Sequence, residues 1–212
     1  MNAVKSPRAY DSTSRQASAR RNQDAILDAA ERRFLEDGYA GTTIATLAAE
    51  AGVSAETVYK VFGGKPGIVG ALYERGLGGS GTIAAYDRSD TMRVHETDPK
   101  SLLRKWGELT AEVAARVNPV LLLVRSAAAT DPNMAALLER SHADRLERMR
   151  HNAHFLVDRG YLRADVSFDE AVDVMWLHSS PELYDLLVLR RGWNSERFGR
   201  YVARSMAAAL LP

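Results

Sequence analysis

Four of the seven prolines divide the chain at points where a helix can begin. Each follows a residue with a capping side chain, in the pairs Asp98-Pro99, Asn118-Pro119, Asp131-Pro132 and Ser180-Pro181. At the N-cap, an Asp, Asn or Ser side chain accepts a hydrogen bond from a free backbone N–H. Proline fits the first helical position because it has no N–H to lose there. Each pair therefore predicts the start of a helix.

Between these points the sequence is rich in Ala, Leu, Glu and Arg, and it lacks the long alternating pattern of a strand. Ser167 and Glu170 have capping-box spacing, and Ser195 is expected to cap the last helix. The stretch from Gly76 to Asp98 begins Gly-Leu-Gly-Gly-Ser-Gly and is interpreted as a connection. The fold class is predicted to be all-α. The expected helices are residues 17–37, 44–51, 55–62, 65–77, 99–117, 119–129, 132–159, 168–178, 181–191 and 195–211.

Composition excludes some classes of protein. The chain has no cysteine, which rules out disulfides, thiolate metal sites and thiol nucleophiles. We see no apolar segment long enough to span a bilayer and no signal sequence, so a cytoplasmic location is expected. No cofactor is expected.

Charge is unevenly distributed along the first 62 residues. The net charge of the whole chain is +1, but residues 1–23 carry five basic side chains against one acidic side chain. Residues 24–62 carry three basic and seven acidic side chains. A basic arm can reach phosphates or a minor groove, although a solvated tail explains the charge equally well. We expect residues 1–16 to be a disordered basic arm.

The most informative motif lies between residues 41 and 62. Thr43 can cap a short helix whose apolar side includes Leu47 and Ala48, and Gly52 stands where a sharp turn requires a positive φ. Ser54 can cap the next helix, on which Val58 points back to the first. A small residue, a turn glycine and a buried aliphatic residue at this spacing predict a helix-turn-helix, although a helical hairpin in any bundle can imitate it.

Three segments together resemble the N-terminal signature of the TetR family of repressors. They are Gly38-Tyr39-Ala40-Gly41-Thr42-Thr43-Ile44, then Leu47-Ala48-x-x-Ala51-Gly52-Val53-Ser54, then Thr57-Val58-Tyr59-x-x-Phe62-x-x-Lys65. The stretch from Ser180 to Trp193 also resembles a region of some actinobacterial-type members. The resemblance implies a three-helix helix-turn-helix head over residues 17–78. It also implies a larger helical domain over residues 79–212 that binds an effector and forms a homodimer.

The resemblance also implies which residues contact DNA. Phosphate contacts fall on Thr43, Tyr59 and Lys65, whose hydroxyl or ammonium groups are suitable donors. Base or groove contacts fall on Ala55, Glu56, Thr57 and Lys60. Ala45 stands where many members have Arg, and Val61 where His or Tyr is common. The operator therefore cannot be inferred from relatives. We expect a repressor that a small molecule releases from a palindromic operator.

The effector site and the dimer surface are predicted less directly. Effector candidates combine aromatic and polar side chains of the large domain, although such residues are more often plain core. They are Trp106, Thr110, Val113, Arg125, Asn152, Phe155 and Trp176. Apolar residues near the C-terminus are assigned to an isologous dimer interface, although one protomer can also bury them. They are Val172, Met175, Trp176, Leu183, Leu186, Leu187, Leu189, Phe198, Val202, Met206 and Leu210.

Two other classes of function compete with this interpretation. An enzyme is not expected, because no phosphate loop, metalloprotease motif or nucleophile elbow occurs. His142, His151 and His154 could in principle bind a metal, but histidines on a solvated helix face explain them better, so no metal is assigned. A helical small-molecule-binding or scaffolding protein that does not touch DNA remains the alternative.

Overall fold

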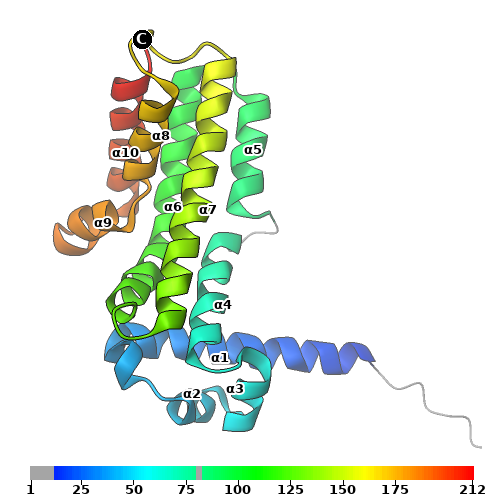
Figure 1. The fold of residues 1–212 in the computed structure, drawn as a ribbon. Helices are drawn as coiled ribbons and strands as arrows, with labels where there is room; N and C mark the ends of the chain where they lie inside the picture. The colour runs from blue at the N-terminus through cyan, green and yellow to red at the C-terminus, as the bar shows by residue number, and fades with distance from the viewer. Residues whose placement is uncertain (1–11, 80–82) are drawn as a thin grey trace, which may run out of the picture.

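The computed structural model describes residues 12–79 and 83–212, and the all-α prediction is confirmed for them. Figure 1 shows α1 (Ser12–Gly41) lying across the base, with α2 (Ile44–Ala51) and α3 (Ala55–Phe62) beneath it. From there α4 (Lys65–Gly78) rises to the large domain. The expected arm over residues 1–16 lies mostly outside the described residues, and the chain is already helical at Ser12.

Two long helices form the axis of the large domain. They are α6 (Pro99–Ala127) and α7 (Pro132–Asp158), with α5 (Ala85–His95) on one side and α8 (Phe168–His178) and α10 (Ser195–Leu210) on the other (Figure 1). Between α8 and α10 the chain forms α9 (Pro181–Tyr184) and the π-helical turn η1 (Asp185–Arg190).

Most of the predicted caps are present. The side chains of Asp98, Asp131 and Ser180 accept hydrogen bonds from backbone N–H groups of α6, α7 and α9, and Ser167 forms the capping box with Glu170. Asn194, not Ser195, caps α10. These short-range bonds depend only on neighbouring residues, which explains why the sequence predicts most of them.

The break expected at Asn118-Pro119 was wrong. Helix α6 is continuous, and Pro119 lies inside it. A proline in a helix interior costs one backbone hydrogen bond and a steric clash. Here Val117, Val120 and Val124 are all buried on the two sides of the proline. Packing of this continuous apolar face holds the helix together.

The connection expected between Gly76 and Asp98 was also wrong, because it contains α5. This helix has little apolar periodicity, and among its residues only Ala85 and Ser89 are buried. Arg88 forms two hydrogen bonds with Glu112 of α6, at 2.7 and 2.9 Å, and Asp90 pairs with Arg148 of α7. Helix α5 is therefore held by partners distant in sequence.

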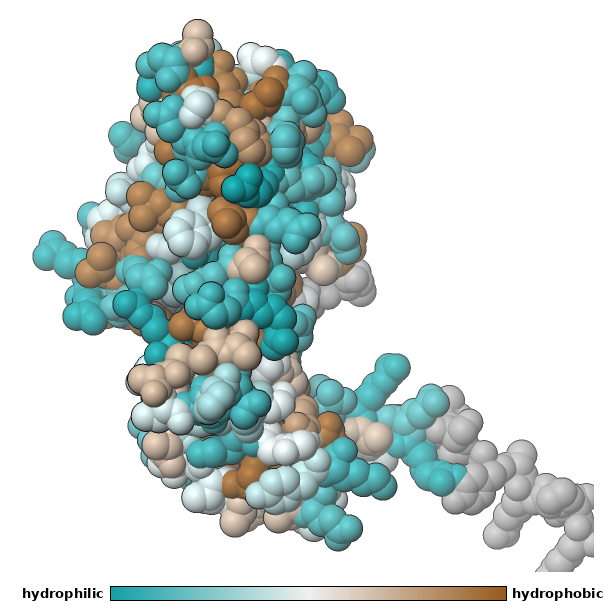
Figure 2. Space-filling view, viewed as in Figure 1, coloured by the Kyte–Doolittle hydropathy of each residue, from teal (hydrophilic) through white to brown (hydrophobic). Residues whose placement is uncertain are grey.

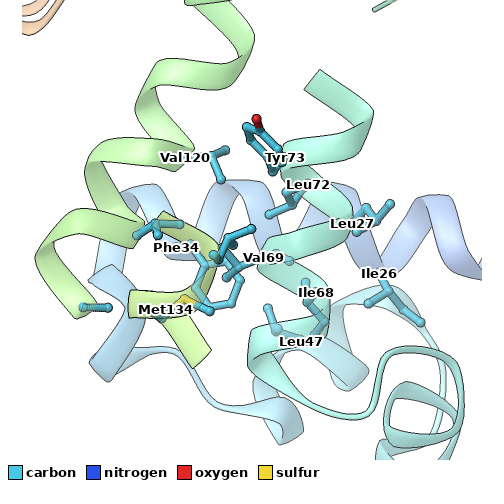
Figure 3. Packing of buried hydrophobic residues seen from close by; sticks show 14 of the residues in the cluster. Ile26, Leu27, Phe34, Leu47, Ile68, Val69, Leu72, Tyr73, Val120 and Met134 are labelled. Carbon is cyan, nitrogen blue, oxygen red and sulfur yellow. The ribbon is translucent and has the colours of Figure 1, made fainter. Parts of the chain in front are cut away.

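The helices at the base share one apolar cluster with the lower ends of α6 and α7. Figure 3 shows Phe34 of α1 beside Val69 of α4, with Val120 and Met134 from the two long helices closing over them. Phe34 and Met134 are each 1% exposed. The division of the chain at residue 78 therefore remains a prediction, since the packing is continuous across it.

Much of the apolar surface assigned to a dimer interface is buried within the protomer. Val172, Met175, Phe198, Val202, Met206 and Leu210 belong to the core cluster of the large domain. Helix α10 packs so closely on α6 that Gly107 and Gly199 face each other at the crossing. Assignment of these six residues to the interface was therefore wrong. Leu186 and Leu189 of η1 are more than half exposed. Hydrophobic residues gather on the left side of Figure 2, where α9 and η1 lie.

Candidate DNA-binding face and internal cavity

Helices α2 and α3 are joined by a tight turn with a cap on each helix. Thr43 Oγ1 accepts a bond from the Thr46 N–H at 3.1 Å, and Ser54 Oγ accepts one from the Thr57 N–H at 3.1 Å. Gly52, between the two helices, has a φ of 66°, which a residue with a side chain rarely adopts. The short turn sets the angle at which α3 leaves α2.

Only one residue of α3 is fully buried. Val58 packs into the core with 0% exposure. Ala55, Glu56, Tyr59 and Lys60 are exposed, and Thr57 is half-buried. The predicted base-reading residues thus share the outer side of one short helix, which the structure leaves uncovered among the described residues.

The three predicted phosphate contacts differ in their surroundings. Thr43 is exposed at the start of α2, and the Tyr59 side chain is 57% exposed. Lys65 is half-buried instead, because its Nζ donates to the Tyr39 carbonyl at 2.7 Å and lies 4.5 Å from the centre of the Tyr39 ring. An intramolecular role for Lys65 was not foreseen from the sequence.

Ion pairs neutralise much of the acidity of this region. Arg33 pairs with Glu50, which links α1 to α2, and Arg75 of α4 bonds to Asp28 and Glu31 of α1 at 2.6 and 2.5 Å. Hydrogen bonding to Arg33 lowers the pKa of the Glu50 carboxyl. Glu50, Asp28 and Glu31 therefore each have a basic partner within the base of the molecule.

A cavity of about 110 Å³ lies between the helices of the large domain, among α4, α5, α6, α7 and α8. Leu109 and Met175 contribute to its apolar wall, and Tyr73 of α4 also lines it. Burial raises the pKa of the Tyr73 hydroxyl. Helix α4 thus contacts α3 at its start and the cavity near its end.

A family model described as "Bacterial regulatory proteins, tetR family" matches residues 26–72. These residues include α2, the turn at Gly52, α3 and most of α4. Over these residues the chain belongs to the TetR family. The matched family is one of regulatory proteins and not of enzymes.

Solved structures similar to this chain share its fold at low identity. The SmeT–triclosan complex is 20% identical, with a TM-score of 0.70 over 90% of this chain and 92% of that chain. The fatty acid degradation regulator FadR of Bacillus halodurans is 17% identical, with a TM-score of 0.71 over 87% and 94%. A regulator of Saccharomonospora viridis in complex with choline is 18% identical, with a TM-score of 0.68 over 93% and 99%. Among proteins of curated function, none matches the regulator in sequence.

The seven effector candidates of the regulator separate into two groups. Four of them line the cavity, namely Trp106, Thr110, Val113 and Asn152. Arg125 lies at the surface and bonds to Glu182 at 2.7 Å. Phe155 packs edge-on against Tyr161, and Trp176 packs under Arg145.

Sequence reasoning identified Asn152 but missed other polar residues of the cavity, among them Ser141 and Arg145. Ser141, Arg145 and Asn152 follow one another on α7 at spacings of four and seven residues, and all three line the cavity of the regulator. That spacing puts side chains on one face of a helix. A polar stripe inside an otherwise apolar face was the signal that could have found them.

The three histidines considered for a metal do not converge. His142 contacts the Trp176 ring, His154 lies 4.3 Å from the Phe168 ring centre, and His151 is 3.9 Å from Asp90. Within residues 12–79 and 83–212, no group of three or more histidine or acidic side chains could hold a metal ion. No helix in that part of the regulator is long and apolar enough to cross a membrane.

Proposed function

We propose that the chain is a dimeric repressor that binds a palindromic operator through α3 and leaves it when a small molecule fills the cavity. The observation that carries the proposal is the exposed outer side of α3, fixed by two capped helices and a glycine turn. A short helix held in this way can enter a major groove. The family match over residues 26–72 supports the same interpretation.

Roles for the individual side chains follow from their exposure. Ala55, Glu56, Thr57 and Lys60 contact base edges or the groove wall. Thr43 and Tyr59 bind phosphate oxygens, because their exposed hydroxyls can donate to them. For Lys65 to contact phosphate, its Nζ must donate to a phosphate oxygen while it remains bonded to the Tyr39 carbonyl.

The dimer surface in this proposal is the outer side of α8 and α10 together with η1. Leu177, Leu186, Leu189 and Tyr201 are exposed there, at 58, 55, 51 and 39%. A two-fold axis through this surface would present two copies of α3 to successive major grooves, about 34–36 Å apart. Light scattering checks it, since Leu177→Glu and Leu186→Glu should shift the protein to a monomer.

Helix α4 connects the two sites. Tyr73 and Leu77 line the cavity, while Ile68 and Leu72, further toward the start of α4, are buried in the cluster at the base. A ligand that displaces the end of α4 therefore changes the support of α3. Coupling of about 1–3 kcal/mol would change operator affinity roughly 5- to 150-fold. Operator DNA must weaken ligand binding by the same factor.

The test is selection of duplex DNA from a random pool, followed by binding measurements on the enriched sequences. A palindromic sequence should emerge, and Lys60→Ala should change the preferred bases. Lys100→Ala is the matched control, because Lys100 is exposed at the start of α6, far from α3 in the chain. A pool that shows no enrichment would contradict the proposed function and favour a helical protein that does not bind DNA.

A further inference from the structure

The cavity of the large domain has an uncompensated positive charge in its lining. Two arginines line it, Arg145 and Arg148. Arg148 pairs with Asp90 and donates to the Tyr86 carbonyl at 2.9 Å. Across residues 12–79 and 83–212, no carboxylate lies within ion-pair distance of Arg145. Of the two, Arg145 is therefore the one without a counter-ion.

The guanidinium of Arg145 is held in place by neutral groups. Its Nη1 donates to the Trp176 carbonyl and to Ser179 Oγ, the latter at 3.2 Å, and its Cζ lies 4.6 Å from the Trp176 ring centre. Its Nε is buried and has no hydrogen-bond partner. Glu182, the acidic residue that acts most on its charge, is exposed and bonded to Arg125. The Arg145 side chain is thus held in position, and its Nε–H is left without a hydrogen-bond acceptor.

Burial lowers the pKa of Arg145 to about 10, so the group stays protonated at neutral pH. A charge removed from water is costly unless an opposite charge or hydrogen bonds compensate it. A carboxylate meets this need well, since its two oxygens match the fork of a guanidinium. Other polar atoms of lining residues also lack partners, namely Ser89 Oγ, Trp106 Nε1, Asn118 Nδ2, Arg148 Nε and Asn152 Oδ1.

We propose that the effector is a compact organic acid whose carboxylate binds Arg145 and whose apolar body packs against Trp106, Leu109 and Met175. This inference rests on the proposed function, because it names the ligand class of the same cavity. The cavity volume of about 110 Å³ limits the size of the acid. An enclosed apolar cavity of 150 Å³ holds benzene, so this smaller volume takes a short-chain acid without a ring.

The experiment compares acids with their neutral amides on the intact dimer. The probes are propionate, butyrate and isobutyrate, each paired with its primary amide and followed by calorimetry and by quenching of tryptophan fluorescence. At least one acid should bind, and at least about tenfold more tightly than its amide, because hydrogen bonds to charged groups are the stronger ones. An amide that binds as well as its acid, or a series in which no acid binds, overturns the proposal.

Two variants test whether Arg145 causes the preference for the acid over its amide. Arg145→Gln removes the charge but keeps a donor for the Trp176 carbonyl, so it should abolish the preference for the acid and leave amide affinity unchanged. Arg150→Gln is the matched control, because Arg150 lies on the same helix, is exposed and does not line the cavity. A preference for the acid that persists in Arg145→Gln would also overturn the assignment. If Arg145→Gln melts far below the wild type, the comparison of acid and amide in the wild type still decides.

Failure of this inference can be distinguished from failure of the proposed function. DNA selection requires no ligand, so a regulator that enriches a palindrome but prefers amides keeps its function and loses only the acidic effector. A protein that binds acids through Arg145 but enriches no DNA keeps the ligand class and loses the regulatory role.

Discussion

Replacing Gly107 by alanine tests the close crossing of α6 and α10. A Cβ at this position would lie 2.6 Å from the Gly199 carbonyl oxygen and 2.7 and 2.9 Å from Ala203 Cβ and N. Two of these neighbours are backbone atoms, which no rotamer change can move away. Bringing the shortest contact from 2.6 to an ordinary 3.4 Å requires α6 and α10 to separate by about 0.8 Å.

The expected loss of stability follows from two opposed terms. Overpacking a close contact costs about 1–3 kcal/mol, here toward the upper value because the contacts are with backbone. Alanine in a helix interior is more stable than glycine by about 1 kcal/mol, which offsets part of this cost. The net loss in the free energy of unfolding is about 2 kcal/mol. At 2–4 °C per kcal/mol for a chain of this size, the melting temperature should fall by about 4–8 °C.

Gly70→Ala is the matched control, because a Cβ there meets nothing within 4 Å. It should raise the melting temperature by about 2–4 °C through helix propensity alone. Circular dichroism at one protomer concentration is the assay, since the stability of a dimer depends on concentration. A Gly107→Ala protein that melts at or above the wild type would refute the close crossing of α6 and α10.

Three further predictions concern the DNA-binding face, the acid stability and the link between the two ends of the molecule. Tyr59→Phe should weaken binding similarly on all DNA sequences, whereas Lys60→Ala should change the preferred base pairs, as measured on selected and scrambled duplexes. Equal behaviour of the two variants would contradict these roles. Hydrogen bonding to Arg88 lowers the pKa of Glu112 to about 2, so its stabilisation is present above about pH 4.5 and is lost as the pH falls toward 2. Urea unfolding of Glu112→Gln should show a weaker loss over that interval, and an unchanged acid profile would count against the ion pair. Tyr39→Phe removes a 2.6 Å hydrogen bond to the carboxylate that caps α7, so its urea midpoint should fall and its ligand should release DNA less completely. A wild-type urea midpoint together with wild-type release of DNA would show that this hydrogen bond does not couple α1 to α7.

The helix-turn-helix was largely predictable because its determinants are local. Thr43, Gly52, Ser54 and Val58 act within one or two turns of the helices that they cap, turn or anchor. The bounds of α2 and α3 agree with the sequence prediction for this reason. The role of Lys65 was not predictable, since its partner Tyr39 lies 26 residues earlier in the chain.

The large domain was less predictable, because its decisive contacts are long-range. Helix α5 lacks a strong pattern of its own and depends on Glu112 and Arg148 of other helices. The apolar residues of α10 could serve equally well in a core or in an interface, and packing against α6 decided for the core. The unpaired charge of Arg145 is visible only when every neighbouring helix is in place.

By itself, the sequence determined the all-α class, the capped helix starts and the helix-turn-helix, since caps, turns and apolar periodicity act over a few residues. Only the tertiary structure decided that α6 continues through Pro119, that α5 is a helix, and which arginine of the cavity lacks a counter-ion. The physical reason is that burial and charge pairing depend on residues brought together from distant parts of the chain. Local propensity contributes at most about 1 kcal/mol per residue for residues other than proline, and packing of a buried face can exceed it.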